Sequence, residues 1–450
     1  MPSVIAIFDI GKTNKKFFLF DEDYQIVFEQ LQQFPETVDE DGFPCDDVHA
    51  LSAWINASIQ DILAMPAFEL KAINFSAYGA SFVHLDAAGN VVAPLYNYLK
   101  PFDEKLKEDF YLKYNGEEVF SVKTASPVLG NLNSGLQLYR IKNQNPTLFS
   151  QIKHSLHLPQ YLSYLVSGRY FSDITSIGCH TGLWNFPEYR YHDWVHQEGV
   201  GEKLAPIHPS NEMMNISIND KPLLCGTGLH DSSAALIPYL ASFKEPFVLI
   251  STGTWCISLN PFNKENLTTT ELKEDCLCYI DYHGNPVKAA RLFAGNEHEI
   301  QTKRLAAQYN VANDYYKTVA YQPEIIAKYQ NNNIQISQQS TLKTSPFEHR
   351  NLEDYPSYEE AYHQLIIDII QLQVTSTNLV LQHTTKKLFV DGGFSKNPIY
   401  MNLLSAAFPR VEVYSTYVAQ ATAIGAAIAV HKQWNTQTLP LEKTIQLKRF

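Results

Sequence analysis

The stretch Val4-Ile5-Ala6-Ile7-Phe8-Asp9-Ile10-Gly11 decides how the first part of the chain folds. Its β-branched and aromatic side chains, ended by an acid and a glycine, predict a buried strand that runs into a turn. The run Phe17–Phe20 predicts a second strand, and Ile26–Phe28 predicts a third. Strands joined by such short turns form a β-meander, so no helix is expected directly after Gly11.

Within the turn, Gly11-Lys12-Thr13 imitates the end of the phosphate-binding loop GxxxxGK[ST]. Ala6 stands where that motif needs its first glycine. A strand also follows where the motif needs the start of a helix. We therefore reject a P-loop here.

A second stretch repeats the first pattern about half a chain later. Phe247–Ile250 is an apolar run that leads into Ser251-Thr252-Gly253-Thr254-Trp255, with the glycine again close behind the strand. Self-similarity at this separation indicates a duplicated fold. We predict two domains, residues 1–244 and residues 245–450, with the junction near residue 245.

Asp231 lies where a strand and a loop lead into a helix. Gly226-Thr227-Gly228-Leu229-His230-Asp231 superficially resembles the dinucleotide motif GxGxxG, but Asp231 stands at the third glycine. The residues Ser232–Ile237 predict a helix that ends at Pro238. From this local pattern alone, Asp231 is either an ordinary helix N-cap or a functional carboxylate.

Three further elements are expected in the second half of the chain. Ser357 and Glu360 form a capping box before a long apolar-periodic helix. Lys386–Val390 predicts a strand that opens into the turn Asp391–Asn397 and a helix from about Pro398. Ala421–Ala429 predicts a helix of small residues suited to close packing.

Composition excludes several classes of protein. The chain has 450 residues, with 35 Lys and Arg against 47 Asp and Glu, which gives a formal net charge of −12. An acidic chain without a basic segment lacks the footprint of a nucleic-acid binder. Its six scattered cysteines predict reduced structural thiols. No apolar run is long enough for a membrane span or a signal-peptide core, so we expect a cytoplasmic protein without membrane partners.

Taken in order, these motifs resemble the actin-like ATPase superfold and, within it, the FGGY family of carbohydrate kinases. His230-Asp231, Pro159–Gly168 and Tyr78–Asp86 are similar to segments of the L-rhamnulokinase branch. The resemblance implies an α/β fold with two actin-like (ribonuclease H-like) domains, each with a mixed β-sheet flanked by helices, and a cleft between them. Departures from the family pattern are Ser81 in place of an acid, Tyr96–Lys100 in place of a stretch with Arg and Asp, and Gln420 in place of Glu.

The same resemblance implies roles for individual residues. Asp231 would be the catalytic base, and Asp9 would hold Mg²⁺. The nucleotide and its phosphates would contact Gly11, Lys12, Thr13, Asn14, Ser251, Thr252, Gly253, Thr254, Gly392, Gly393 and Asn397. The sugar would contact Tyr78, Ser81, His84, His230 and Trp255, although Tyr78 and Trp255 could be core aromatics and a lone histidine is more often structural.

The expected reaction is ATP-dependent phosphorylation of a free ketose, with L-rhamnulose or L-fuculose as the first choices. Xylulose, ribulose or another polyol would be an alternative substrate within the family. From a different class, the chain could be a non-catalytic actin-like ATP-binding sugar sensor. The expected ligands are ATP, Mg²⁺ and a small sugar, and a homodimer is the assembly that the family resemblance suggests.

Overall fold

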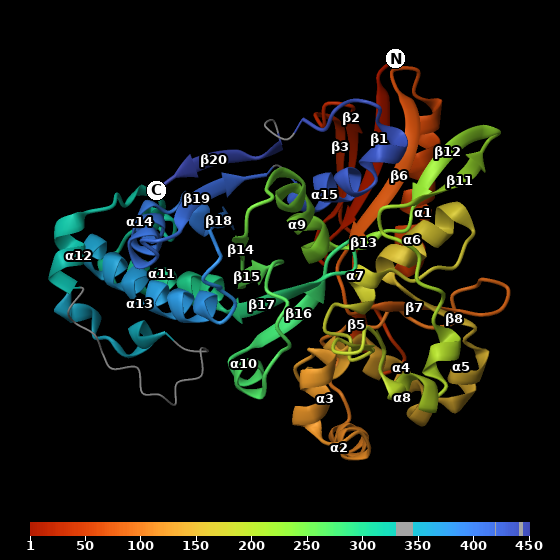
Figure 1. Ribbon diagram of the computed structural model, residues 1–450, viewed down its shortest axis with the longest axis horizontal. Helices are drawn as coiled ribbons and strands as arrows, with labels where there is room; N and C mark the ends of the chain where they lie inside the picture. Colours follow the sequence, from red (N-terminus) through yellow and green to blue (C-terminus); the bar gives the residue numbers. More distant parts are fainter. Residues whose placement is uncertain (330–344, 419, 441–443) are drawn as a thin grey trace. The chain divides into compact units, whose positions relative to one another are not determined.

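The computed structural model describes residues 1–329, 345–418, 420–440 and 444–450 in two compact units (Figure 1). Unit 1 contains Met1–Ser242, Cys278–Pro286 and Ala419–Thr444, and unit 2 contains Phe243–Leu277, Val287–Val418 and Ile445–Phe450. Each unit thus includes segments from both halves of the chain. The single domain boundary near residue 245 stays a prediction, because the two compact units cannot be separated by one cut in the sequence.

The sheet of unit 1 confirms the β-meander at the start of the chain. Strands β1 (Ser3–Ile10), β2 (Lys15–Asp21) and β3 (Ile26–Gln32) pair antiparallel in that order. On the other side of β1 the order continues with β6 (Glu69–Ala77), β12 (Lys221–Gly226) and β11 (Met213–Ile218). Because β2 directly follows the Gly11 turn, the structure agrees with the rejection of a P-loop.

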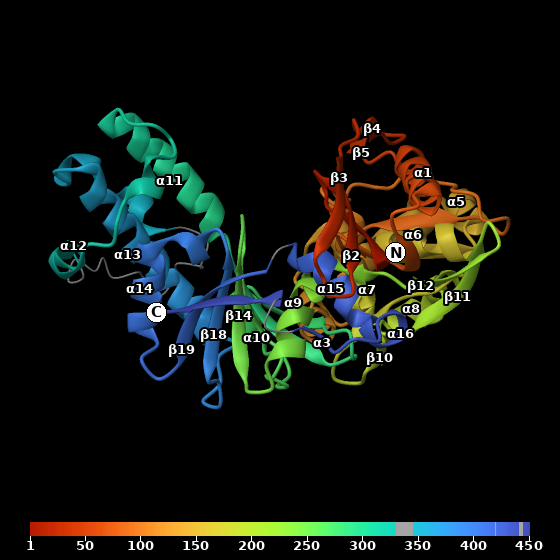
Figure 2. The ribbon, with the colours of Figure 1, turned by 90° about the horizontal axis from the view of Figure 1, so that it is seen from above.

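Helices cover both faces of this sheet, as Figure 2 shows for α1 and α15 on opposite sides of the red strands. Alternate residues of β1, from Val4 to Ile10, join a core with α1 (Val48–Ala64) and α6 (Leu158–Ser167). The opposite face packs against α15 (Ala421–Ala429), which also lies on α9 (Asp231–Ser242). This face carries Asp9, since side chains alternate along a strand.

A helical region with its own aromatic core completes unit 1. Phe110, Phe120 and Trp194 are fully buried there and meet edge to face. Its helices and strands are β7 (Phe82–Leu85), α2 (Glu104–Lys113), α3 (Glu117–Thr124), α4 (Ser134–Gln144), α5 (Pro146–Gln151), β8 (His154–His157), α7 (Ile174–Ile177), β9 (Trp184–Asn185), β10 (Arg190–Tyr191) and α8 (Asp193–Gln197).

Unit 2 repeats the strand arrangement of unit 1, which confirms the predicted duplication. Its central strand β14 (Phe247–Thr252) is antiparallel to β15 (Cys256–Asn260), as β1 is to β2. On the other side β14 is parallel to β18 (Lys387–Gly392), and β18 is parallel to β19 (Glu412–Tyr417), as β1 is to β6 and β6 to β12. The remaining strands of this sheet are β20 (Gln446–Arg449), β17 (Pro286–Leu292) and β16 (Cys276–Ile280), of which Cys278–Ile280 belong to unit 1.

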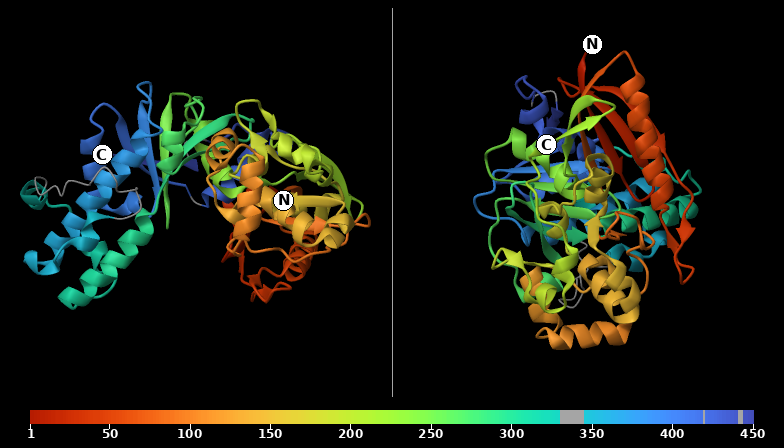
Figure 3. Two further views of the ribbon diagram at one scale, coloured as in Figure 1. Left: turned by 90° about the horizontal axis from the view of Figure 1, so that it is seen from below. Right: turned by 90° about the vertical axis from the view of Figure 1, so that its right-hand side faces the viewer.

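The long helix expected after Ser357 is α13 (Tyr358–Asn378), and the Ser357 hydroxyl accepts the amide hydrogen of Glu360. Figure 3 shows α11 (Ala294–Tyr309) in teal beside α13 in light blue. The strand, turn and helix expected at residues 386–398 are β18 and α14 (Pro398–Ala407). The other elements are β4 (Thr37–Val38), β5 (Pro44–Cys45), β13 (Leu229–His230), α10 (Thr269–Lys273), α12 (Pro323–Tyr329) and α16 (His431–Trp434).

Two predictions about composition can be compared with the structure. All six cysteines are buried and free of disulfide bonds, as expected for structural thiols. Within the described part of the chain, none of the helices combines the length and apolar character needed to cross a bilayer.

The prediction that the helix after Asp231 ends at Pro238 is wrong, because α9 continues through Pro238 to Ser242. Proline has no N–H to donate to the carbonyl group four residues earlier, which belongs to Ala234. This carbonyl oxygen instead lies against Gly425 of α15, where a Cβ atom would be only 1.9 Å from it. The missing helix bond is therefore compatible with a close helix-to-helix contact.

We expect Gly425→Ala to destabilise the protein, although alanine is the better helix former by about 1 kcal/mol. The added methyl group must push α15 away from α9, and such overpacking typically costs about 1–3 kcal/mol. Differential scanning calorimetry should show a melting temperature several degrees lower. Gly201→Ala is the control, since its Cβ would lie 3.3 Å from the His196 side chain. An unchanged or higher melting temperature for Gly425→Ala would contradict the packing argument.

Candidate active site

Three parallel strands of unit 1 end at the same edge of the sheet. β6 pairs with β1 on one side and with the short strand β13 on the other. In this register Asp9 and Leu229 both lie opposite Ser76, and Asp231 follows directly after β13. Asp9 and Asp231 thus lie at the carboxyl ends of strands separated by one neighbour. This is where parallel α/β sheets bind ligands.

Asp9 is buried on the face of the sheet that packs against α15. It is 9% exposed, and its Oδ2 atom accepts a hydrogen bond of 2.7 Å from the Thr422 hydroxyl. Burial raises the pKa of Asp9 to about 6, against the lowering effect of the Thr422 hydrogen bond, and the charge of Asp231 raises it further. The influence of Asp231 indicates that the two carboxylates are close enough to repel each other.

Asp231 is the first residue of α9. Its Oδ1 atom accepts the Ser232 amide hydrogen at 2.6 Å, which satisfies one of the free N–H groups at the helix start. A third of its side-chain surface is exposed, but protein surrounds the carboxyl group on most sides and raises its pKa to about 6. A carboxylate that titrates near neutrality while remaining partly accessible is suited to proton transfer.

His230 is a second polar neighbour of the Asp231 carboxylate. Its Nε2 atom lies 3.2 Å from Asp231 Oδ1 and 3.1 Å from the Cys179 sulfur. Burial lowers the pKa of His230 to about 4, so the ring is neutral at neutral pH. Gly79 follows β6 and lies so close that a Cβ there would be 2.9 Å from the imidazole. His230 is therefore placed to hold Asp231 rather than to move freely.

The predicted phosphate turn after β1 is tight and well connected. The Gly11 amide donates to the Asn14 carbonyl at 2.9 Å, and the Asn14 side chain accepts a hydrogen bond from Gln33. Thr13 is exposed. The Lys12 amino group is 2.6 Å from a carboxylate oxygen of Asp46, a residue that belongs to none of the predicted motifs.

The predicted sugar residues of unit 1 are mostly enclosed. Tyr78 donates its hydroxyl hydrogen to Asp46 at 2.8 Å and is 7% exposed, and Ser81 is 1% exposed. His84 is fully buried, and its Nδ1 atom lies 2.9 Å from the Ser155 hydroxyl. Burial and the charge of Arg140 lower the pKa of His84 to about 3. These contacts favour a structural role for His84.

In unit 2, the turn after β14 is packed against two other segments. The Thr252 hydroxyl donates to the Asp391 carbonyl and accepts the Phe394 amide hydrogen at 3.0 Å. Gly392 has φ = +87°, and a Cβ there would be 1.9 Å from the Thr252 carbonyl oxygen. The Gly393 amide donates to that same carbonyl at 2.9 Å. The glycines predicted to matter at the end of β18 thus allow the turns after β14 and β18 to touch.

Gly253, Thr254 and Trp255 in this turn are exposed, whereas Ser251 is half-buried. Ser251 lies in β14 opposite Asp391, and Thr254 accepts the Asn296 amide hydrogen through its carbonyl oxygen at 3.1 Å. The Trp255 side chain is 40% exposed and rests on Phe293, with the ring centroids 4.4 Å apart. Trp255 is thus an accessible surface aromatic and not part of the core.

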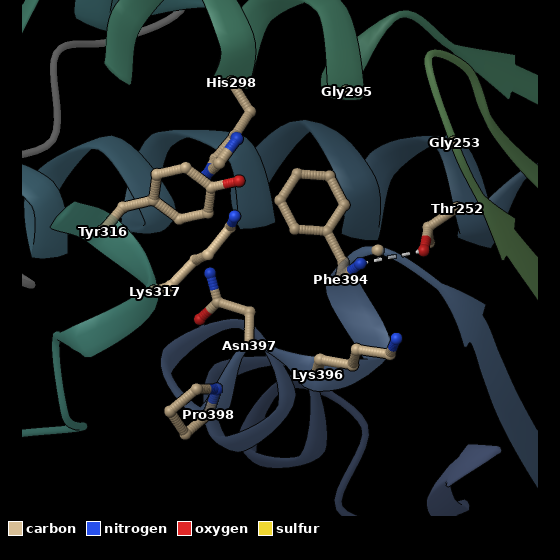
Figure 4. Close-up of a pocket in the computed structure, with 11 residues that line it drawn as sticks. Thr252, Gly253, Gly295, His298, Tyr316, Lys317, Phe394, Lys396, Asn397 and Pro398 are labelled. Atoms are coloured by element: carbon tan, nitrogen blue, oxygen red, sulfur yellow. Dashed lines mark hydrogen bonds between the residues drawn. The ribbon is translucent and has the colours of Figure 1, made fainter. Parts of the chain in front are cut away.

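A cavity of about 520 Å³ opens beside this turn (Figure 4). Predicted nucleotide residues Thr252, Gly253, Gly393 and Asn397 line it. Its other lining residues follow no motif that would have selected them; they are Gly295, His298, Tyr316, Lys317, Phe394, Lys396 and Pro398. Aromatic rings with a few polar and cationic groups are typical of a small-molecule site.

One wall of this cavity is held by hydrogen bonds among three helices. Asn397 caps α14 through its Oδ1 atom, which accepts the amide hydrogens of Ile399 and Tyr400. Its Nδ2 atom donates to the Tyr362 hydroxyl at 2.7 Å, and this hydroxyl lies 2.9 Å from His298 Nε2. Asn397 thus shapes the cavity, but both ends of its amide group are already engaged.

The acidic groups of unit 1 suit a metal that binds together with phosphate. Among residues 1–329, 345–418, 420–440 and 444–450, no cluster of three or more His, Cys, Asp or Glu side chains could hold a metal by itself. Mg²⁺ is usually held by one or two carboxylates, waters and substrate phosphates. The desolvated Asp9 carboxylate, with Asp231 near it, fits that donor set.

Two family models match the chain and together span most of it. The N-terminal domain of the FGGY family of carbohydrate kinases matches residues 4–221, and the C-terminal FGGY carbohydrate kinase domain matches residues 244–438. The chain belongs to the FGGY family of carbohydrate kinases. The FGGY family is the one that the strand ends, the His230-Asp231 pair and the glycine turns indicated.

Curated relatives of this FGGY chain are similar at low identity. A rhamnulokinase from Mannheimia succiniciproducens is 25% identical over 293 residues, which cover 60% of this chain and 55% of the relative. A rhamnulokinase from Bacteroides thetaiotaomicron is 24% identical over 243 residues, which cover 51% of this chain and 48% of the relative. The chain spans about half the length of the curated relatives that it matches.

Solved structures confirm the predicted fold class of an FGGY kinase, with two α/β domains that each have a mixed sheet flanked by helices. A carbohydrate kinase from Novosphingobium aromaticivorans superposes with a TM-score of 0.81 at 22% identity, over 100% of this chain and 94% of the other. Ligand-bound xylulose kinase from Lactobacillus acidophilus gives 0.78 at 16% identity, over 99% and 93%. At these identities the likeness shows the fold alone.

We expect Asp9→Asn to stabilise the protein in metal-free buffer, with a gain at pH 5 of about half the gain at pH 8. The pKa of Asp9 is about 6 in the folded chain against 3.8 ordinarily, so its stabilising proton is bound below pH 3.8 and lost as pH rises through 6. This difference corresponds to about 3 kcal/mol. Calorimetry should show a gain in melting temperature at pH 8 that shrinks toward pH 5.

The exposed residue Asp61 supplies the control, because Asp61→Asn removes one carboxylate without changing a buried site. A gain for Asp9→Asn that is the same at both pH values would show that the Asp9 carboxylate is not destabilised by burial.

Proposed function

We propose that the protein is an ATP-dependent sugar kinase in which Asp231 is the general base. The observation that carries this proposal is the pair of desolvated carboxylates, Asp9 and Asp231, at the carboxyl ends of parallel strands in unit 1. Phosphoryl transfer requires positioning, charge stabilisation and a base for the attacking hydroxyl, and no covalent protein nucleophile.

In the proposed step, the sugar hydroxyl gives its proton to Asp231 as its oxygen forms a bond to the γ-phosphorus of ATP. The bond between the γ-phosphorus and the β,γ-bridging oxygen breaks, and ADP leaves with the electron pair. The raised pKa of Asp231 makes its carboxylate a better proton acceptor than an ordinary aspartate. The start of α9 places the positive end of a helix dipole beside the same group.

Asp9 is the proposed Mg²⁺ ligand, with Thr422 orienting its carboxylate. When bound, Mg²⁺ neutralises phosphate charge and orients the phosphate oxygens. The Thr422 hydroxyl occupies one lone pair of Oδ2 and thus directs the remaining lone pairs. We further propose that Gly11, Lys12, Thr13 and Asn14 contact the phosphates, for which Lys12 would exchange its Asp46 partner for phosphate oxygens.

We place the nucleotide in the 520 Å³ cavity of unit 2. Thr252, Gly253 and Gly393 line the part of the cavity at the ends of β14 and β18. Ser251, Thr254 and Gly392 belong to the same two turns. The Gly253, Gly392 and Gly393 amides donate within these turns, so we propose that phosphate oxygens meet the hydroxyl groups of Ser251 and Thr254. This local supply of donors would let a chain of net charge −12 bind a polyphosphate.

For the sugar, we propose a ketose, with L-rhamnulose and L-fuculose as the first candidates. The support is that the curated relatives are named rhamnulokinase. His230, which lies beside Asp231, is a proposed sugar contact in unit 1, together with Tyr78 and Ser81. The exposed ring of Trp255 is the proposed contact in unit 2.

Asp231→Asn should lower sugar-dependent ADP formation by about 10²- to 10⁴-fold, because the amide cannot accept the hydroxyl proton. The measurement is a coupled ADP-release assay with L-rhamnulose, L-fuculose, D-xylulose, D-ribulose and glycerol. Binding of ADP, measured by calorimetry, should stay within about threefold of wild type. Asp220→Asn, at an exposed turn, is the matched control.

Wild-type turnover by Asp231→Asn would exclude Asp231 as the base. If wild-type protein binds ADP but forms none from ATP with any sugar of the panel, the sensor function would replace the kinase function.

The rate should fall on the acid side of pH 6, since both Asp231 and Asp9 must lose a proton and the pKa of each is about 6. Two required ionisations make kcat/KM fall by more than about tenfold per pH unit below pH 5. Saturating Mg²⁺ should reduce the slope toward about tenfold, because metal binding displaces the proton of Asp9. A flat profile from pH 7 to pH 5 would contradict both assignments.

A further inference from the structure

The hydrogen bonds from Asn397 to Tyr362 and on to His298 have a direction that the structure fixes. The Asn397 amide cannot be flipped, because its oxygen accepts the Ile399 and Tyr400 amide hydrogens at the start of α14. Its Nδ2 atom must therefore donate to the Tyr362 hydroxyl at 2.7 Å. The Tyr362 oxygen is thus already an acceptor and still has its own hydrogen to place.

His298 Nε2 is the acceptor available to that hydrogen, at 2.9 Å from the Tyr362 oxygen. Tyr362 is fully buried, and among the described residues its hydroxyl has no other hydrogen-bond partner than Asn397 and His298. If His298 donated from Nε2 instead, the phenol hydrogen would be buried and unsatisfied, which is the costlier arrangement. Burial also lowers the pKa of His298 to about 4, so the ring is neutral and carries one hydrogen.

The hydrogen of His298 therefore lies on Nδ1. In the described part of the chain this atom makes no hydrogen bond of its own, while the imidazole lines the cavity of unit 2. Figure 4 shows the ring directed toward the cavity between Tyr316 and Phe394. Both neighbouring rings meet it edge to face, with centroids 4.8 and 5.2 Å away, and hold its plane. The relay thus ends in one oriented N–H donor between apolar walls.

We propose that His298 is the residue that reads the nucleobase, by donating its Nδ1 hydrogen to a ring nitrogen of a purine, with Tyr362 and Asn397 as positioning residues. This inference rests on the proposed nucleotide site in the same cavity. A purine has flat apolar faces that suit Tyr316 and Phe394, and its ring nitrogens are neutral acceptors. An anionic group would instead be drawn to Lys317 and Lys396, which also line the cavity.

The test is a double-substitution cycle on ligand and protein, measured as ADP affinity by calorimetry. Wild type is titrated with ADP and with its 1-deaza, 3-deaza and 7-deaza analogues, each of which lacks one ring nitrogen. One analogue should bind wild type about 3- to 10-fold more weakly than ADP, as expected for one lost hydrogen bond. His298→Phe should bind ADP that much more weakly and should bind the sensitive analogue as well as it binds ADP.

Tyr362→Phe tests the relay, because it frees His298 Nε2 to carry the hydrogen. Nitrogen-15 spectra should show protonated Nδ1 in wild type, a mixture of tautomers in Tyr362→Phe, and weaker ADP binding by about threefold. Tyr358→Phe is the matched control: its ring stacks on that of Tyr362 at 6.0 Å, but it has no bond to His298 and should leave both readings unchanged.

The outcomes separate this inference from the proposed function. If ADP does not bind wild type, both the nucleotide site and the role of His298 are wrong. If ADP binds but each analogue loses the same factor in wild type and in His298→Phe, the nucleotide site stands and His298 does not read the base. Protonated Nε2 in wild type would also overturn the inference.

Discussion

Three parallel strands that end at one edge of unit 1 determine where the two important carboxylates lie. Backbone pairing sets Asp9 and Leu229 opposite the same residue of β6, so Asp9 and Asp231 cannot move apart without breaking the sheet. Burial of the two carboxylates is a cost that the fold must bear, since it raises each pKa to about 6 instead of 3.8, and the charge of Asp231 raises that of Asp9 further. Sites of this kind retain groups that lower stability because the same groups perform chemistry.

The duplicated sheet of unit 2 uses the same strand end differently. β14 and β18 occupy the positions of β1 and β6, but the turn after β14 has hydroxyl groups and a glycine where the other unit has Asp9. Gly392 and Gly295 lie so close to the carbonyl oxygens of Thr252 and Gly253 that side chains could not fit at these two positions. One scaffold therefore offers a carboxylate site in unit 1 and a glycine turn with hydroxyl groups in unit 2.

Much of this arrangement could be predicted from local sequence. The meander, the repeat at Phe247, the helix after Ser357 and the glycine turn at Gly392 all depend on short-range patterns. The helix end at Pro238 was predicted wrongly, because local chemistry does not reveal that Gly425 lies against the Ala234 carbonyl group. His298 and Tyr316 were missed for a related reason, since they follow no motif. The packing of α11 against α13 brings His298 to the cavity, and Tyr316, from a turn beyond α11, meets the His298 ring there at 4.8 Å. Composition likewise does not reveal that segments of the second half of the chain, such as residues 420–440, belong to unit 1.

This arrangement makes the carboxylate site of unit 1 depend on a distant part of the chain. Residues 420–440 are in the C-terminal half of the sequence but pack within unit 1, where α15 lies on α9 and on β1. Thr422 reaches Asp9 from this helix, and the buried Asn74 side chain of β6 donates to the Ala426 carbonyl at 2.9 Å. The close contact at Gly425 sets the distance between α15 and α9, the helix that begins at Asp231. The packing of α15 and the register of the strands thus both hold the two carboxylates in position.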